Sequence, residues 1–79
     1  MSRRALVTGS EGFTGRYVCQ ALANAGWEVW GSGVAADSPS SRYVRLDVLD
    51  PSSIKSALST VQPDVVIHLA AMSFVAEND

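Results

Sequence analysis

The 79-residue sequence has few residues that could cross-link a fold or build a metal centre. It contains one cysteine, Cys19, and one histidine, His68. A single cysteine excludes a disulfide within the chain and is typical of a reducing compartment, so we expect a cytoplasmic protein. Because protein metal sites need several ligands, a lone histidine in an apolar run predicts a core residue hydrogen-bonded to backbone, and we predict no metal site.

Strong net charge and long apolar runs are also missing. The formal net charge is -2, which gives no electrostatic footprint for nucleic acid. No apolar stretch approaches the ~20 residues that a membrane-spanning helix needs. The basic start followed by apolar residues resembles a signal peptide, but the run is too short and glycines follow at once. We therefore expect neither a nucleic-acid nor a membrane partner.

Short apolar runs alternate with helical patterns along the whole chain. Helical spacing of apolar residues begins after Gly12, and Gly26 suits the position just beyond a helix end. Asp50 followed by Pro51 predicts the start of a second helix, which Pro63 cannot continue. Four strands are predicted, at 5–7, 28–31, 43–46 and 65–69. Residues 31–41 are predicted to form a loop, and the last strand reads as a central strand covered on both faces.

This order of elements predicts the α/β class. Strands that alternate with helices form a parallel sheet with right-handed crossovers, and the expected strand order is 3-2-1-4. Ligands of such sheets bind at the carboxyl ends of the strands that flank the switch point. Here that position lies between Thr8-Gly9 and Ala70-Ala71.

Three glycines occupy the first of these strand ends, in the stretch TGSEGFTG at residues 8–15. The predicted strand–turn–helix context gives each a role in a phosphate-binding loop. Gly9 would allow a sharp turn, Gly12 would let the backbone approach a pyrophosphate, and Gly15 would let the helix pack closely on the sheet. The alternative is that the glycines only permit a tight strand–helix connection.

This stretch resembles the T-G-x-x-G-F-x-G loop of the extended short-chain dehydrogenases/reductases, the NAD-dependent epimerase/dehydratase family. The segments LDVLD at 46–50 and VVIHLAAMSFV at 65–75 resemble two further family motifs in the same order. Within the family, EVWGS and HLAAMSFV are most similar to GDP-4-keto-6-deoxymannose reductases and GDP-mannose 4,6-dehydratases. The resemblance implies the N-terminal part of a Rossmann fold, a dinucleotide cofactor and a nucleotide-sugar substrate in the full-length enzyme.

The family motifs also imply which residues contact the cofactor. Asp47 would hydrogen-bond the adenine amino group; the alternative, which the family match makes the weaker one, is a turn residue. The complete set of predicted cofactor-binding residues is Gly9, Ser10, Glu11, Gly12, Phe13, Thr14, Gly15, Ser32, Asp47, Val48, Leu69, Ala70 and Ala71.

The sequence departs from the family at the catalytic pair Tyr-x-x-x-Lys. Tyr17 is followed four residues later by Ala21 and Tyr43 by Asp47, so neither has the lysine. We assign no catalytic residue and expect residues 1–79 to be a partial NAD(P)-binding domain without catalytic or substrate regions, inactive alone. The fourth strand would then present an apolar edge, which predicts self-association or pairing with a missing C-terminal portion. The alternative is a stand-alone, non-catalytic nucleotide-binding or assembly module.

A second departure lies at the end of the second strand and bears on cofactor choice. NAD-specific enzymes place an acidic residue there to hold the ribose 2′-OH. Here Gly31-Ser32-Gly33 occupies the position, with Asp37 a possible substitute from the loop. The alternative is that Arg16 or Arg42 reaches a 2′-phosphate. The sequence therefore slightly favours NADP(H) over NAD(H).

Overall fold

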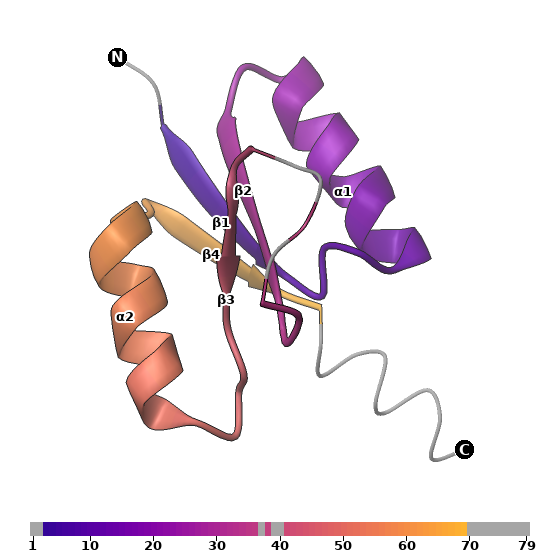
Figure 1. Cartoon of the computed structure of the whole chain (residues 1–79). Coiled ribbons are helices and arrows are strands. Elements are labelled where there is room, and N and C mark those ends of the chain that lie inside the picture. Colours follow the sequence, from indigo (N-terminus) through magenta and orange to yellow (C-terminus); the bar gives the residue numbers. More distant parts are fainter. Residues whose placement is uncertain (1–2, 37, 39–40, 70–79) are drawn as a thin grey trace.

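A computed structural model describes residues 3–36, 38 and 41–69 of the chain. The elements follow one another as β1 (Arg4–Thr8), α1 (Phe13–Asn24), β2 (Glu28–Gly33), β3 (Tyr43–Arg45), α2 (Pro51–Val61) and β4 (Val65–His68). The four strands form one parallel sheet in the order β3-β2-β1-β4. Helices α1 and α2 lie on opposite sides of that sheet (Figure 1). The predicted α/β class and strand order 3-2-1-4 are confirmed.

The core of the fold is centred on β1. Ala5, Leu6 and Val7 are fully buried because β1 has a paired strand along each edge and a helix lies over each face of the sheet (Figure 1). Side chains alternate between the two faces of a strand, so Leu6 lies on the opposite face of the sheet from Ala5 and Val7. On that face it joins the cluster beneath α2. That cluster contains Leu6, Leu46, Ala57 and Val61, with Trp30, Val44 and Ile54 packed against it. Ile54, Ala57 and Val61 therefore form an apolar stripe that anchors α2 to the sheet.

Both helices begin and end at the residues that the sequence suggested. Gly12 is the N-cap of α1, and Gly26, just past its end, has a φ of 95°, which glycine adopts at little cost. Asp50 caps α2, because its carboxylate accepts a hydrogen bond from the Ser52 amide over 3.1 Å, and Pro51 is the first helical residue. Helix α2 ends at Val61, before Pro63, but the left-handed conformation of its C-cap Gln62, with a φ of 51°, was not predicted.

The predicted start of the loop at residue 31 is wrong, because β2 continues to Gly33. The Gly31 amide donates to the Arg42 carbonyl over 2.9 Å, and the Leu46 amide donates to the Gly33 carbonyl over 2.7 Å. These backbone bonds to the β3 segment, together with the pairing to β1, hold the glycines in the sheet. Side-chain patterns do not reveal such a strand, because glycine contributes no side chain.

The prediction that the last strand is covered on both faces is also wrong. Val65 is 38% exposed and Val66 44% exposed. Among the described residues, β4 pairs only with β1, and no described helix packs on it closely enough to bury these valines. Within the described residues, β4 is therefore an edge strand in spite of its apolar composition.

Neither helix in the described part of the chain is long and apolar enough to cross a membrane. Within the same residues, no three side chains of histidine, cysteine, aspartate or glutamate gather where they could hold a metal ion.

Candidate functional site

The glycine loop, residues 9–15, joins the carboxyl end of β1 to the start of α1. Gly9 has a φ of 69°, in the left-handed region, which lets the chain turn sharply out of the strand. The Gly12 amide donates to the Gly9 carbonyl over 3.2 Å, and the Arg16 amide donates to the Gly12 carbonyl over 3.0 Å. The loop is therefore a closed backbone turn that leads directly into the helix.

Gly15 lies where α1 approaches the loop most closely. A Cβ placed on Gly15 would collide with the Gly9 carbonyl oxygen and lie 2.7 Å from Ser10 Cα and 2.9 Å from Ser10 carbonyl carbon. All three atoms belong to the backbone, so no flexible side chain can move aside. Close packing of the first helix thus requires glycine here, as the sequence suggested.

Gly12 differs, because nothing in the fold itself requires glycine there. Its φ of -77° and ψ of 171° suit any residue, and an added Cβ would lie at an ordinary 3.6 Å from the Gly9 carbonyl oxygen. Gly12 is also an N-cap that has no side chain to bond the first amides of α1, which have no acceptor within the helix. The space beside Gly12 and these amides form a cradle suited to an anionic group.

Ser10 is buried in the loop and bonded to β2. Its hydroxyl accepts a hydrogen bond from the Ser32 amide over 2.9 Å and lies 3.3 Å from the Ser32 carbonyl, to which it donates. Ser32 is fully buried, and its hydroxyl donates to the Val7 carbonyl over 2.9 Å. Both hydroxyls are thus occupied inside the protein, so any contact of these two residues with a cofactor remains a prediction.

The remaining predicted residues of the loop are open to solvent. Phe13 is 90% exposed, and Glu11 and Thr14 are also exposed. The Glu11 carboxylate accepts a hydrogen bond from the Ser38 hydroxyl over 3.0 Å.

Asp47 lies at the same edge of the sheet, in the turn between β3 and α2. Its Oδ1 accepts a hydrogen bond from the Leu49 amide over 3.0 Å, and its Oδ2 lies 3.9 Å from an Arg45 guanidinium nitrogen. The Asp47 backbone is bonded to the Ser53 hydroxyl. The side chain thus has the turn role that the sequence left open, and Val48 beside it is partly exposed. Contact of either residue with adenine stays a prediction.

The ends of β1 and β4 meet as the switch-point argument requires. Thr8 is in register with His68, and Thr8 Oγ1 lies 2.8 Å from His68 Nδ1. The prediction that His68 is a core residue bonded to backbone is wrong: the side chain is exposed and its partner is a hydroxyl. Leu69 is buried, whereas the predicted contacts at Ala70 and Ala71 lie outside the described residues.

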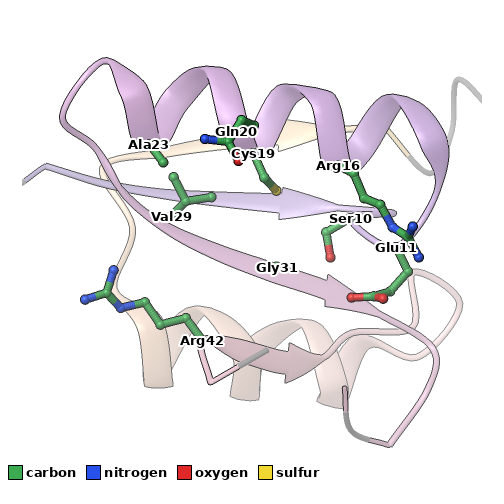
Figure 2. A pocket seen from close by; sticks show the side chains of 9 residues that line it. All are labelled: Ser10, Glu11, Arg16, Cys19, Gln20, Ala23, Val29, Gly31 and Arg42. Atoms are coloured by element: carbon green, nitrogen blue, oxygen red, sulfur yellow. The ribbon is translucent and has the colours of Figure 1, made fainter. Parts of the chain in front are cut away.

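A groove of about 330 Å³ runs between α1 and β2 on the side toward β3. Figure 2 shows Arg16 and Glu11 at the end nearest the glycine loop and Arg42 at the start of β3. Cys19 also lines the groove, and burial, with a smaller contribution from the Glu11 charge, raises the pKa of its thiol. Sequence reasoning considered both arginines singly but gave no sign that they would line one groove.

The parallel sheet in the order 3-2-1-4, with a glycine loop after its first strand, defines a Rossmann-type α/β fold. Residues 5–79 match the family described as "NAD dependent epimerase/dehydratase family". The chain belongs to that family.

Individual relatives include proteins of different kinds. Methionine adenosyltransferase 2 subunit beta of Xenopus laevis is 39% identical over 70 residues, which are 89% of this chain and 20% of that protein. GDP-6-deoxy-D-talose 4-dehydrogenase of Aggregatibacter actinomycetemcomitans is 35% identical over 75 residues, 94% of this chain and 23% of that protein. A candidate epimerase of known structure from Burkholderia cenocepacia J2315 is 39% identical, with a TM-score of 0.72 over 86% of this chain and 25% of that one. The chain thus spans about a fifth to a quarter of the length of these relatives.

Proposed function

We propose that this chain is the N-terminal, cofactor-binding portion of a nucleotide-sugar oxidoreductase, dehydratase or epimerase that uses NAD(P). The single observation that carries the proposal is Gly12. The fold has room for a side chain at this position, so packing within the fold does not explain the glycine. A pyrophosphate bound to the adjacent helix amides would explain it, because a side chain at residue 12 would block its approach. Membership of the NAD dependent epimerase/dehydratase family supports a nicotinamide dinucleotide. When bound, such a cofactor supplies or accepts the hydride.

The residues proposed to hold the cofactor fall into three groups. The glycine loop binds the pyrophosphate through the first backbone amides of α1, those of residues 13–15. Asp47 and Val48 are proposed to contact the adenine, and Leu69 is proposed to contact the nicotinamide together with Ala70 and Ala71, which lie outside the described residues.

We infer a preference for NADP(H) over NAD(H) from the charges near the end of β2. The buried Ser32 occupies the strand end, so no carboxylate is placed there to repel a 2′-phosphate. Arg16 lines the adjoining groove at the end near the glycine loop, beside Glu11, whereas the Arg42 guanidinium is directed toward the start of β2, where its charge acts on Glu28 (Figure 2). The Arg16 guanidinium is thus the group that favours an additional phosphate at this end of the groove.

The substrate class is a nucleotide-activated sugar, and the finer assignment is a GDP-linked deoxy sugar. The resemblance of EVWGS and HLAAMSFV to GDP-sugar enzymes supports this, as does a relative named for GDP-6-deoxy-D-talose. The chain itself has no Tyr-x-x-x-Lys, and the Tyr43 hydroxyl donates to the Ala35 carbonyl over 3.0 Å. The 79 residues alone therefore turn over no sugar nucleotide.

A second candidate is a non-catalytic binding or assembly module. It is favoured by the similarity to a protein named as a subunit of methionine adenosyltransferase 2. Both candidate functions require this domain to bind a nucleotide or a partner protein. Only the first also requires the complete protein to carry out a hydride-transfer reaction.

Gly12→Val tests the shared cofactor site by isothermal titration with NADP⁺ and NAD⁺. The branched side chain would occupy the phosphate cradle, so we expect binding of both nucleotides to be lost while the helix content stays unchanged. Thr60→Val, which introduces the same side chain on the exposed face of α2, is the matched control and should bind like the parent chain. Undiminished binding by Gly12→Val would overturn the loop assignment.

A further inference from the structure

Ser10 lies in a slot that two glycines from different elements keep open. On one side, a Cβ on Gly15 of α1 would collide with backbone atoms of residues 9 and 10. On the other side, a Cβ on Gly31 of β2 would collide with Ser10 Oγ and lie 3.0 Å from Ser10 Cβ. Figure 2 shows the Ser10 side chain directed toward Gly31. The slot therefore fits a serine in place and leaves no room for a larger side chain.

The hydrogen bonds of Ser10 extend the pairing of β1 and β2 beyond the end of β1. The sheet register ends with Thr8 opposite Ser32. Past that point, the Ser10 amide donates to the Ser32 carbonyl over 3.2 Å, and the Ser10 hydroxyl bonds both the Ser32 amide and the Ser32 carbonyl. The Ser32 hydroxyl returns to the Val7 carbonyl. The first half of the glycine loop is thus tied to a rigid strand.

Removing the Ser10 hydroxyl would leave the Ser32 amide without its acceptor in a buried place. Ser10 is 6% exposed and Ser32 is fully buried, so water has little access to replace the bond. A buried donor without a partner is costly, and the loop would have to rearrange to satisfy it. Such a rearrangement would disturb the turn closed by the Gly12 amide and the Gly9 carbonyl.

We propose that Ser10 is a positioning residue that holds the glycine loop in its phosphate-binding conformation through its hydrogen bonds to the Ser32 backbone. This inference rests on the proposed cofactor-binding function. It assigns Ser10 an action through the loop amides, so the hydroxyl itself touches no cofactor atom.

Three variants separate hydrogen bonding from space filling. Ser10→Ala keeps the Cβ and removes only the hydroxyl. Gly31→Ala places a methyl group on the position of Ser10 Oγ and should destabilise the fold. The double variant Ser10→Gly with Gly31→Ala fills the slot again without the hydrogen bonds. Ser59→Ala, at an exposed position of α2, is the matched control.

Two measurements apply to each variant: hydrogen exchange of the Gly12 amide in the ligand-free chain, and the dissociation constant for NADP⁺. For Ser10→Ala we expect faster exchange of this amide and binding weakened by about tenfold, the loss typical of one buried hydrogen bond. For the double variant we expect thermal stability to recover relative to Gly31→Ala, while exchange stays fast and binding stays weak. Ser59→Ala should match the parent chain in both measurements.

Unchanged Gly12 exchange in Ser10→Ala would overturn the positioning role, whether or not the chain binds nucleotide. Full recovery of exchange protection by the double variant would also overturn it, since filling the slot would then suffice. If the parent chain binds neither NADP⁺ nor NAD⁺, the proposed function fails, and the exchange measurement still decides the role of Ser10.

Discussion

Gly15→Ala is the substitution for which the structure gives the clearest expected cost. The new methyl group would meet the Gly9 carbonyl oxygen and two backbone atoms of Ser10, at 2.7 Å and 2.9 Å for the latter pair. These atoms are held by the loop's own hydrogen bonds and by the bonds of Ser10 to β2. The helix must therefore move away from the sheet or the loop must deform.

The magnitude follows from two opposing effects. Overpacking a rigid site costs about 3 kcal/mol at the upper end of its usual range. Replacing glycine by alanine inside a helix returns about 1 kcal/mol. The net destabilisation is therefore about 2 kcal/mol, which for a domain of this size lowers the midpoint of thermal unfolding by about 10 °C.

Thermal unfolding followed by circular dichroism measures this change directly. Gly12→Ala is the matched control, because its methyl group meets only an ordinary contact at 3.6 Å. Its cost is about 1 kcal/mol or less, from the weaker preference of alanine for the N-cap. If Gly15→Ala unfolds at the same temperature as the parent chain or higher, the close approach of α1 to the loop is not as described and the reasoning fails.

Three further predictions concern other parts of the fold. Cys19 should react with iodoacetamide at pH 8 more slowly than free cysteine, because burial and the Glu11 charge raise the pKa of its thiol. Glu11→Gln should speed the reaction, and equal rates for parent and variant would remove Glu11 as a cause. The hydrogen bond from the Trp30 indole, and to a lesser degree the Arg4 charge, lower the pKa of Glu28. The ionised carboxylate therefore stabilises the fold at pH values above the ordinary glutamate pKa of about 4.3. This contribution is lost as the pH falls through the lower pKa of the folded state. Unfolding midpoints at neutral and acid pH should therefore differ less in Glu28→Gln than in the parent, and an equal difference would contradict the assignment. Gln62→Gly should raise the free energy of unfolding by about 0.5–1 kcal/mol, since glycine adopts the left-handed conformation at Gln62 without strain, and a loss of stability in urea unfolding would refute it.

Much of the fold could be predicted because local signals agreed with the tertiary structure. Gly12, Gly26 and Asp50 mark helix boundaries through backbone conformation and capping, which depend on neighbouring residues only. The alternation of strands and helices then leaves few possible topologies, and 3-2-1-4 is the one observed.

The errors arose where tertiary contacts decide the outcome. Gly31–Gly33 is a strand because β1 and β3 pair with it, and a glycine-rich stretch carries no pattern that reveals such partners. The exposure of Val66 and His68 depends on what covers β4, which composition cannot report.

The position of the candidate site could be predicted from the sequence, but the hydrogen bonds inside it could not. The spacing of Gly9, Gly12 and Gly15 indicated a phosphate loop, and the structure gives the first and last of them the conformational and packing reasons expected. The bonding of Ser10 to Ser32 across 22 positions in the sequence had no local signal. The one sequence feature related to this contact is Gly31, because a glycine inside a strand often marks the close approach of another segment, here Ser10.

The central claim is that the glycine loop binds the pyrophosphate of a dinucleotide. Titrating NADP⁺ into the ¹⁵N-labelled chain and following its amide resonances by NMR tests this most directly. We predict saturable shifts largest for the amides of residues 9–15, with smaller shifts at Asp47 and Val48, and none of these shifts in Gly12→Val. Saturable binding whose shifts fall elsewhere, or no binding by the correctly folded chain, would contradict the account.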